Sequence, residues 1–64
     1  MPTIDVTTGQ RSREQKEQLI RELTEVSSRI MELPEQAFTV FIHELDDSSI
    51  GVGGKTLAEF VKSR

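Results

Sequence analysis

A long amphipathic helix between two strand-like segments limits the fold of this chain more than any other feature. Residues 13–32 carry apolar side chains at three- and four-residue steps, with charged side chains on the other side. Ser12 and Gln15 form a capping-box pattern that marks the start of the helix, and Pro34 disfavours helical geometry at Leu33. Such a helix is about 30 Å long, enough to cross back over a sheet.

The segments on either side of this helix have the patterns of β-strands. Residues 2–8 alternate, with Ile4 and Val6 on one side, and residues 38–45 are rich in β-branched and aromatic side chains. Strand, helix and strand in this order predict a βαβ unit, whose right-handed crossover makes the two strands parallel. The helix then covers one face of the sheet and leaves the other face bare.

Glycine punctuates the remainder of the chain. A polar turn at residues 46–49 precedes Ile50, and three glycines within residues 51–54 predict a tight turn. The pattern of residues 55–64 fits either a short helix or one strand of a hairpin. The sequence therefore predicts a single α+β domain over residues 1–64, a βαβ unit with a short C-terminal hairpin or helical turn.

The small size of the chain predicts self-association. A domain of 64 residues buries only about 60% of the surface that its unfolded form exposes. The chain has no cysteine and a single histidine, so neither disulfides nor a His/Cys metal cluster can support it. Apolar residues make up 34% of the chain, which is little against a backbone entropy cost of about 1–2 kcal/mol per residue. We therefore expect an obligate oligomer whose other copies cover the bare sheet face.

The charge pattern argues against two classes of partner. The net charge of −3 comes from 11 acidic and 8 basic residues, and no stretch gathers Lys and Arg into the stripe that binds a phosphate backbone. No apolar run reaches the ~20 residues of a membrane span, and the N-terminus lacks the pattern of a signal peptide. We expect a cytoplasmic protein that binds neither nucleic acid nor membranes.

Two motifs that could carry chemistry have simpler explanations. Gly54, Lys55 and Thr56 match the end of a phosphate-binding loop, but Ser49 stands where the full pattern needs glycine, so we interpret the glycines as a turn. His43, on the second strand, is more typical of a packed or hydrogen-bonded residue than of a catalytic one. The sequence predicts no metal site and no cofactor.

The N-terminus is the remaining candidate for chemistry. A small second side chain such as that of Pro2 usually allows removal of Met1, which leaves a free secondary amine. An α-amino group has a reference pKa of about 7.7–8.0, and desolvation lowers it toward the value that suits a base near neutral pH. Because many proteins begin Met-Pro only for processing, this feature alone leaves a catalytic and a neutral interpretation open.

Several short pieces spread along the chain match one family pattern in order. They are Pro2 at the head of a strand, Gln10-Arg11-Ser12, Glu14-Gln15-Lys16-Glu17, Leu19-Ile20-Arg21-Glu22, Ile42, Glu44 and Gly51-Val52-Gly53-Gly54. With these pieces the chain resembles the 4-oxalocrotonate tautomerase family over nearly its whole length. The resemblance implies short βαβ subunits with a C-terminal hairpin, assembled as hexamers that are trimers of dimers.

The resemblance also implies an activity and a site. Family members are isomerases that use an N-terminal proline as general base, without a cofactor, so Pro2 would move a proton on an unsaturated 2-oxo or 2-hydroxy acid. Substrates such as 2-hydroxymuconate or phenylenolpyruvate are implied. Arg11 would bind the carboxylate, with Arg13 as its substitute because the loop after the first strand is one residue shorter here.

The chain departs from the family pattern at substrate-binding positions. Thr39 stands in place of a second arginine, and Ile50 in place of an aromatic wall. Loss of a charge-assisted hydrogen bond removes about 1.5–3 kcal/mol, so the departure implies altered substrate choice. Val52 and Ala37 stand where water-activating and decarboxylating relatives carry acids, which favours plain tautomerisation. A non-catalytic oligomer that binds small ligands is the alternative.

Overall fold

The computed structural model describes residues 1–62 of the chain. Its strands and helices, in chain order, are β1 (Thr3–Thr8), α1 (Arg13–Met31), β2 (Thr39–Glu44), β3 (Gly51–Val52), β4 (Lys55–Thr56) and α2 (Leu57–Lys62). Two 3-10 turns, η1 (Glu35–Ala37) and η2 (Asp47–Ser49), lie before and after β2.

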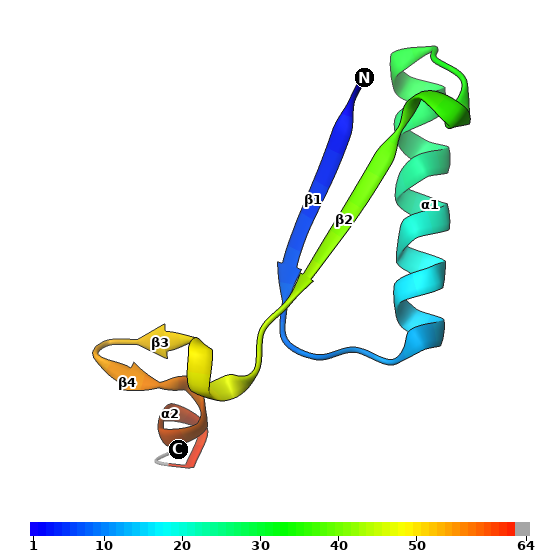
Figure 1. Cartoon of the computed structure of the whole chain (residues 1–64). Coiled ribbons are helices and arrows are strands. Elements are labelled where there is room, and N and C mark those ends of the chain that lie inside the picture. Colours follow the sequence, from blue (N-terminus) through cyan, green and yellow to red (C-terminus); the bar gives the residue numbers. More distant parts are fainter. Residues whose placement is uncertain (63–64) are drawn as a thin grey trace.

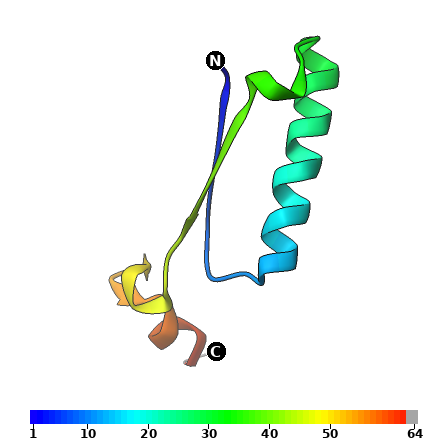
Figure 2. The same cartoon turned by 45° about the vertical axis from the view of Figure 1, so that its right-hand side comes forward.

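The first half of the structure is the predicted βαβ unit. β1 and β2 pair in parallel, with a register that runs from Thr3 opposite Thr39 to Thr8 opposite Glu44. Figures 1 and 2 show α1 running along one face of this two-stranded sheet, while no element covers the other face in the described part of the chain. The predicted α+β fold with parallel strands is therefore confirmed.

Helix α1 begins and ends where local chemistry dictates. Ser12 Oγ accepts a hydrogen bond from the Gln15 N–H at 3.1 Å, and Gln15 Oε1 accepts one from the Ser12 N–H at 3.2 Å, which completes the predicted capping box. At the other end Glu32 adopts the left-handed conformation, with φ of 54°. This conformation ends α1 at Met31, one residue before the predicted end.

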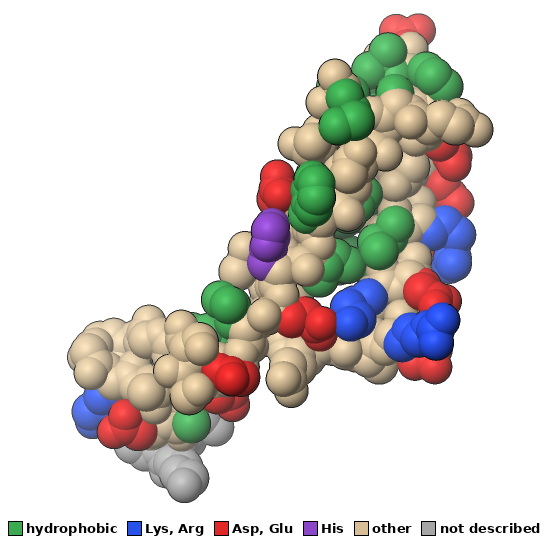
Figure 3. Space-filling view, in the orientation of Figure 1, with side chains coloured by type: hydrophobic (Ala, Val, Ile, Leu, Met, Phe, Trp, Pro, Cys, Tyr) green, Lys and Arg blue, Asp and Glu red, His purple; other side chains and the backbone are tan. Residues whose placement is uncertain are grey.

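The apolar side chains of a single copy are only half-buried. Ile4 and Val6 of β1 and Ile42 of β2 lie on the side of the sheet that faces α1, yet among residues 1–60 no side chain is buried. On the bare face Phe41 is 45% exposed, and Ile30 near the end of α1 is 70% exposed. Figure 3 shows apolar side chains scattered over the visible surface of the unit. One copy thus lacks the core that a stable domain needs.

Residues 51–62 form both structures that the sequence left open, and residues 63 and 64 of the predicted segment lie outside the described part of the chain. β3 and β4 pair antiparallel through a turn in which Gly53 has φ of 60° and Gly54 has φ of 87°, values that favour glycine. Helix α2 follows at once, and Thr56 and Glu59 exchange the reciprocal backbone-to-side-chain hydrogen bonds of a capping box, at 3.2 and 3.3 Å. Figures 1 and 2 show this unit standing away from α1, beyond the end of β2.

A polar link ties the loop before α1 to the end of β2. Glu44 Oε2 accepts a hydrogen bond from the Arg11 backbone N–H at 2.9 Å, and Glu44 Oε1 accepts one from Lys16 Nζ at 2.8 Å. The side chains of Glu44 and Lys16 are each about a third exposed. These two interactions, with the Lys16 hydrogen bond the larger cause, lower the pKa of Glu44 below its ordinary value.

The exposed apolar surface predicts that stability depends on protein concentration. Association buries side chains that a single copy leaves exposed, and mass action then stabilises the folded oligomer. We expect the Tm measured by circular dichroism to rise steadily with protein concentration, and sedimentation to detect an oligomer. A monomer whose Tm does not change with concentration would contradict this expectation.

The lowered pKa of Glu44 predicts a loss of stability in acid. Because the folded-state pKa lies below the unfolded one, the contribution is complete above the ordinary glutamate pKa of about 4.3 and disappears as the pH falls through the lowered value. At fixed protein concentration, the wild type should therefore be more stable than Glu44→Gln at neutral pH, and the gap in Tm should close in acid. Glu25→Gln, on an exposed position of α1, is the matched control. Parallel curves for the wild type and Glu44→Gln would refute the assignment.

Candidate functional site

The amino end of the sheet brings Pro2 and Thr39 together. The Pro2 carbonyl accepts a hydrogen bond from the Thr39 N–H at 3.2 Å, and Pro2 is half-buried. Met1 precedes it, 88% exposed, and its sulfur accepts a hydrogen bond from Thr39 Oγ1 at 3.4 Å. In the full chain the Pro2 nitrogen belongs to a peptide bond, so it becomes a basic amine only when Met1 is removed.

Arg11 lies at the opposite, carboxyl end of the sheet. It follows β1 and is exposed, and it borders a cavity of about 190 Å³ between α1 and the sheet. The cavity is lined by Val6, Thr8, Arg11, Gln15, Lys16, Leu19 and Ile42. Its floor is apolar and its rim carries two cationic side chains, which is a suitable surface for the carboxylate of an apolar acid.

A single copy keeps Pro2 and Arg11 apart. The six residues of β1 separate them, and a strand rises about 3.3 Å per residue, so the two ends of β1 lie roughly 20 Å apart. Within one copy, Pro2 and Arg11 therefore cannot contact the same small acid at the same time. Of the predicted site residues, the structure brings only Thr39 to Pro2.

The other two predicted residues lie elsewhere. Arg13 is the first residue of α1, and its Nε forms an exposed ion pair with Glu17 Oε1 at 3.1 Å, so it does not border the cavity beside Arg11. Ile50 is half-buried in the C-terminal unit, where its carbonyl accepts a hydrogen bond from the Leu57 N–H at 2.7 Å. Figure 1 shows this unit at the far end of the sheet from the N-terminus.

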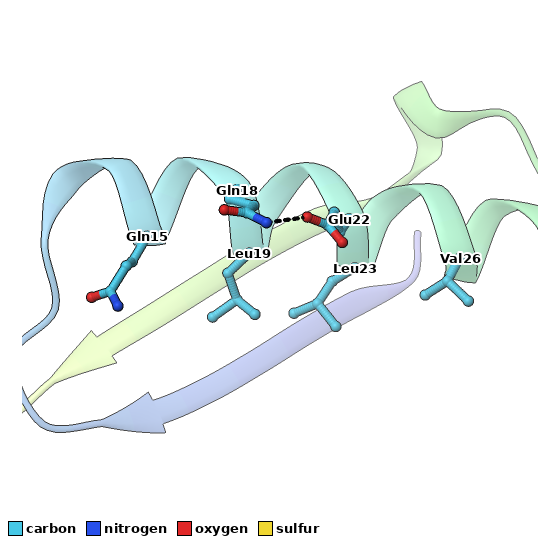
Figure 4. Close-up of a pocket in the computed structure, with 6 residues that line it drawn as sticks. All are labelled: Gln15, Gln18, Leu19, Glu22, Leu23 and Val26. Carbon is cyan, nitrogen blue, oxygen red and sulfur yellow. Dashed lines mark hydrogen bonds between the residues drawn. The ribbon is translucent and has the colours of Figure 1, made fainter.

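A second cavity shows that the apolar side of α1 is wider than two strands can cover. It has a volume of about 450 Å³ and is lined by Gln15, Gln18, Leu19, Glu22, Leu23 and Val26. Figure 4 shows Leu19, Leu23 and Val26 projecting from one side of α1, beside the sheet, while Gln18 donates a hydrogen bond to Glu22 at 2.6 Å. Half of the lining side chains are apolar, and the only ionisable one, Glu22, accepts the hydrogen bond from Gln18, so we interpret this groove as a packing surface.

The bare face of the sheet carries the only histidine of the chain. His43 Nε2 lies 3.2 Å from Asp5 Oδ1, and its ring stacks on that of Phe41 with centroids 6.3 Å apart. This contact agrees with the interpretation of His43 as a hydrogen-bonded residue. Among residues 1–62 no cluster of three or more His, Cys, Asp or Glu side chains could hold a metal ion. In the same range no helix has the length and apolar character needed to span a bilayer.

Comparison of the sequence with known proteins identifies one family. Residues 3–59 match the Tautomerase family, described as tautomerase enzyme. A probable tautomerase of Streptococcus pyogenes serotype M3 is 49% identical over 47 residues, which cover 73% of this chain and 75% of the relative. A 2-hydroxymuconate tautomerase of Pseudomonas fluorescens is 44% identical over 45 residues, covering 70% of this chain and 71% of that protein.

Solved structures of tautomerases have the same fold as this chain. The structure of TomN, a 4-oxalocrotonate tautomerase homologue in the tomaymycin biosynthetic pathway, is 29% identical, with a TM-score of 0.89 over 95% of each chain. A heterohexameric 4-oxalocrotonate tautomerase from Chloroflexus aurantiacus J-10-fl is 27% identical, with a TM-score of 0.78 over 92% of this chain and 95% of the other. The family pattern matches most of the length of the chain, and the fold agrees with the solved structures. The chain therefore belongs to the tautomerase family.

Proposed function

We propose that the chain, once Met1 is removed, is a cytoplasmic tautomerase in which the amine of Pro2 moves a proton on an unsaturated 2-oxo or 2-hydroxy acid. The observation that carries the proposal is the position of Pro2 at the head of β1, half-buried and bonded to Thr39, in a chain of this family. The 2-hydroxymuconate tautomerase of Pseudomonas fluorescens supports the substrate class.

The chemistry follows from an uncharged secondary amine. Its lone pair takes a proton from an enol hydroxyl or an α-carbon, and the protonated amine returns that proton to another carbon of the conjugated acid. The proline ring restricts the direction of the lone pair, because the nitrogen lies within the ring. No metal or cofactor is needed, since the amine is both acceptor and donor of the proton.

The Arg11 that binds the substrate carboxylate belongs to a different copy of the chain from the Pro2 that moves the proton. A guanidinium forms two parallel hydrogen bonds with a carboxylate, and it stabilises the negative charge that develops as the proton leaves. Because about 20 Å of strand separates Pro2 from Arg11, the two residues serve one substrate only if neighbouring copies place opposite sheet ends together.

Assembly into a homohexamer, a trimer of dimers, meets this requirement. Three observations support association of copies: residues 1–60 include no buried side chain, the flank of α1 carries an apolar groove, and the C-terminal unit stands away from α1. A related 4-oxalocrotonate tautomerase is a heterohexamer. In such an assembly Ile50 would close the site of a neighbour as an apolar wall.

Thr39 gives the proposed site its preference among acids. Its backbone N–H is bonded to Pro2, and its hydroxyl, which donates to the Met1 sulfur in the full chain, can donate one hydrogen bond to a substrate once Met1 is removed. An arginine there would add a positive charge and a second donor. A substrate with two carboxylates therefore finds a charged partner for only one of them. The site should accept an acid with one carboxylate, such as phenylenolpyruvate, in preference to the dicarboxylate 2-hydroxymuconate.

Replacement of Pro2 tests the base directly. On protein whose mass shows that one methionine is missing, Pro2→Ala replaces the ring-held secondary amine with a freely rotating primary amine and should lower kcat/KM for phenylenolpyruvate. Protein that retains Met1 has no free amine at Pro2 and should lose the contribution of a positioned base, about 10²–10⁴-fold. The wild-type rate should fall as the pH drops below the pKa of the amine, because the protonated amine cannot accept a proton. Full activity of Pro2→Ala, or a rate insensitive to acid, would remove the basis of the proposal. Binding of these acids without turnover by the processed wild type would instead identify a non-catalytic binder.

Replacement of Thr39 tests the preference. Thr39→Arg should raise kcat/KM for 2-hydroxymuconate by about tenfold or more, the value of one charge-assisted hydrogen bond, and change that for phenylenolpyruvate much less. Thr39→Gln, which adds length without charge, is the matched control and should leave the ratio of the two substrates near that of the wild type. Equal changes for both substrates in Thr39→Arg would show that Thr39 does not set the preference.

A further inference from the structure

Glu44 joins three parts of the chain that are distant in sequence. It is the last residue of β2, and its register partner is Thr8 at the end of β1. One carboxylate oxygen accepts the Arg11 backbone N–H at 2.9 Å, and the other accepts Lys16 Nζ at 2.8 Å. The Leu45 N–H adds a backbone hydrogen bond to the Thr8 carbonyl at 3.0 Å, so the end of the sheet is closed beside this carboxylate.

These contacts fix the backbone of Arg11 on both sides. On one side the capping box holds Ser12, the next residue in the chain, at the start of α1. On the other side the paired end of β1 holds Thr8, so the loop between them spans only Gly9 to Arg11. The bond from the Arg11 N–H to Glu44 is the side-chain contact that ties this loop to β2.

The same contacts leave the guanidinium of Arg11 available. Glu44 meets the backbone of Arg11 and the ammonium of Lys16, and no ion pair of the Arg11 side chain is formed within residues 1–62. Lys16 and Arg11 border the same cavity, but the charge of Lys16 is already paired with Glu44. Arg11 is therefore the cation at this cavity that can still take an incoming carboxylate.

We propose that Glu44 is a positioning residue, which holds the Arg11 backbone and neutralises Lys16 so that the Arg11 guanidinium binds the substrate carboxylate. This inference rests on the proposed function, in which Arg11 binds that carboxylate. Glu44 itself touches neither the substrate nor Pro2, which lies at the other end of β1. Its loss therefore weakens substrate binding and spares the proton transfer.

A double-mutant cycle between Glu44 and Arg11 tests the inference with phenylenolpyruvate as the probe. Glu44→Ala should raise KM by about tenfold with little change in kcat, because a displaced binding group costs affinity and not the base. In an Arg11→Ala background the same change should add nothing, because the group that Glu44 positions is gone. Glu44→Gln keeps one acceptor for the Arg11 N–H and should restore most of the affinity.

Two further variants control for the loss of a charge elsewhere and for a failure of Glu44→Ala to assemble. Glu14→Ala removes a negative charge from the first turn of α1 without touching the link, and it should leave KM unchanged. If Glu44→Ala does not assemble by sedimentation, Glu44→Asp replaces it, because the shorter carboxylate retains the charge but cannot reach both partners. The same rise in KM, absent in the Arg11→Ala background, is then expected.

The outcomes separate the two proposals. If Arg11→Ala raises KM while Glu44→Ala and Glu44→Asp behave as the wild type, the positioning role of Glu44 is wrong and the role of Arg11 stands. An equal effect of Glu44→Ala with and without Arg11 also overturns the positioning role, because it indicates a general structural effect. If Arg11→Ala leaves KM unchanged, the proposed role of Arg11 fails, and the inference on Glu44 fails with it.

Discussion

The parallel pairing of β1 with β2 is the interaction on which the rest of the structure depends. Its register places Thr39 opposite Thr3 and Glu44 opposite Thr8, so each end of the sheet receives residues from both strands. The amino end of the sheet holds Pro2. The carboxyl end holds Arg11, whose backbone N–H donates a hydrogen bond to the Glu44 carboxylate. A change of register by one residue would invert the faces of a strand and separate these partners.

The incomplete core of a single copy links stability to function. Helix α1 covers one face of a sheet that is only two strands wide, and its apolar flank extends past the strands into an open groove. The bare face exposes Phe41, and the C-terminal unit exposes Val52. Because the proposed base and the proposed carboxylate-binding residue occupy opposite ends, the association that completes the core would also complete the site.

The departures from the family pattern fall at the proposed substrate-binding positions and not at the proposed base. Pro2 retains its place at the head of the first strand, whereas Thr39 beside it carries no charge. At the other end Glu44 accepts a hydrogen bond from the Arg11 backbone N–H, and no residue within 1–62 forms an ion pair with the Arg11 guanidinium. In the proposed function this arrangement would combine the base with a single charged group for the acid, and it would favour acids with one carboxylate.

Local sequence signals determined the elements of this protein, and tertiary structure decided which residues meet. The order of strand, helix and strand, the start of α1 at its capping box and the position of Pro2 all follow from patterns a few residues long, because side-chain periodicity and capping act over one or two turns. Helix α2 has such a signal as well, since Thr56 and Glu59 have the spacing of a capping box. The neighbouring glycines favour a hairpin, so local signals alone fit both structures in this segment. The link between Glu44 and Arg11, and the separation of Arg11 from Pro2, had no local signal. They depend on the strand register and on the crossing of α1, which bring together residues more than thirty positions apart.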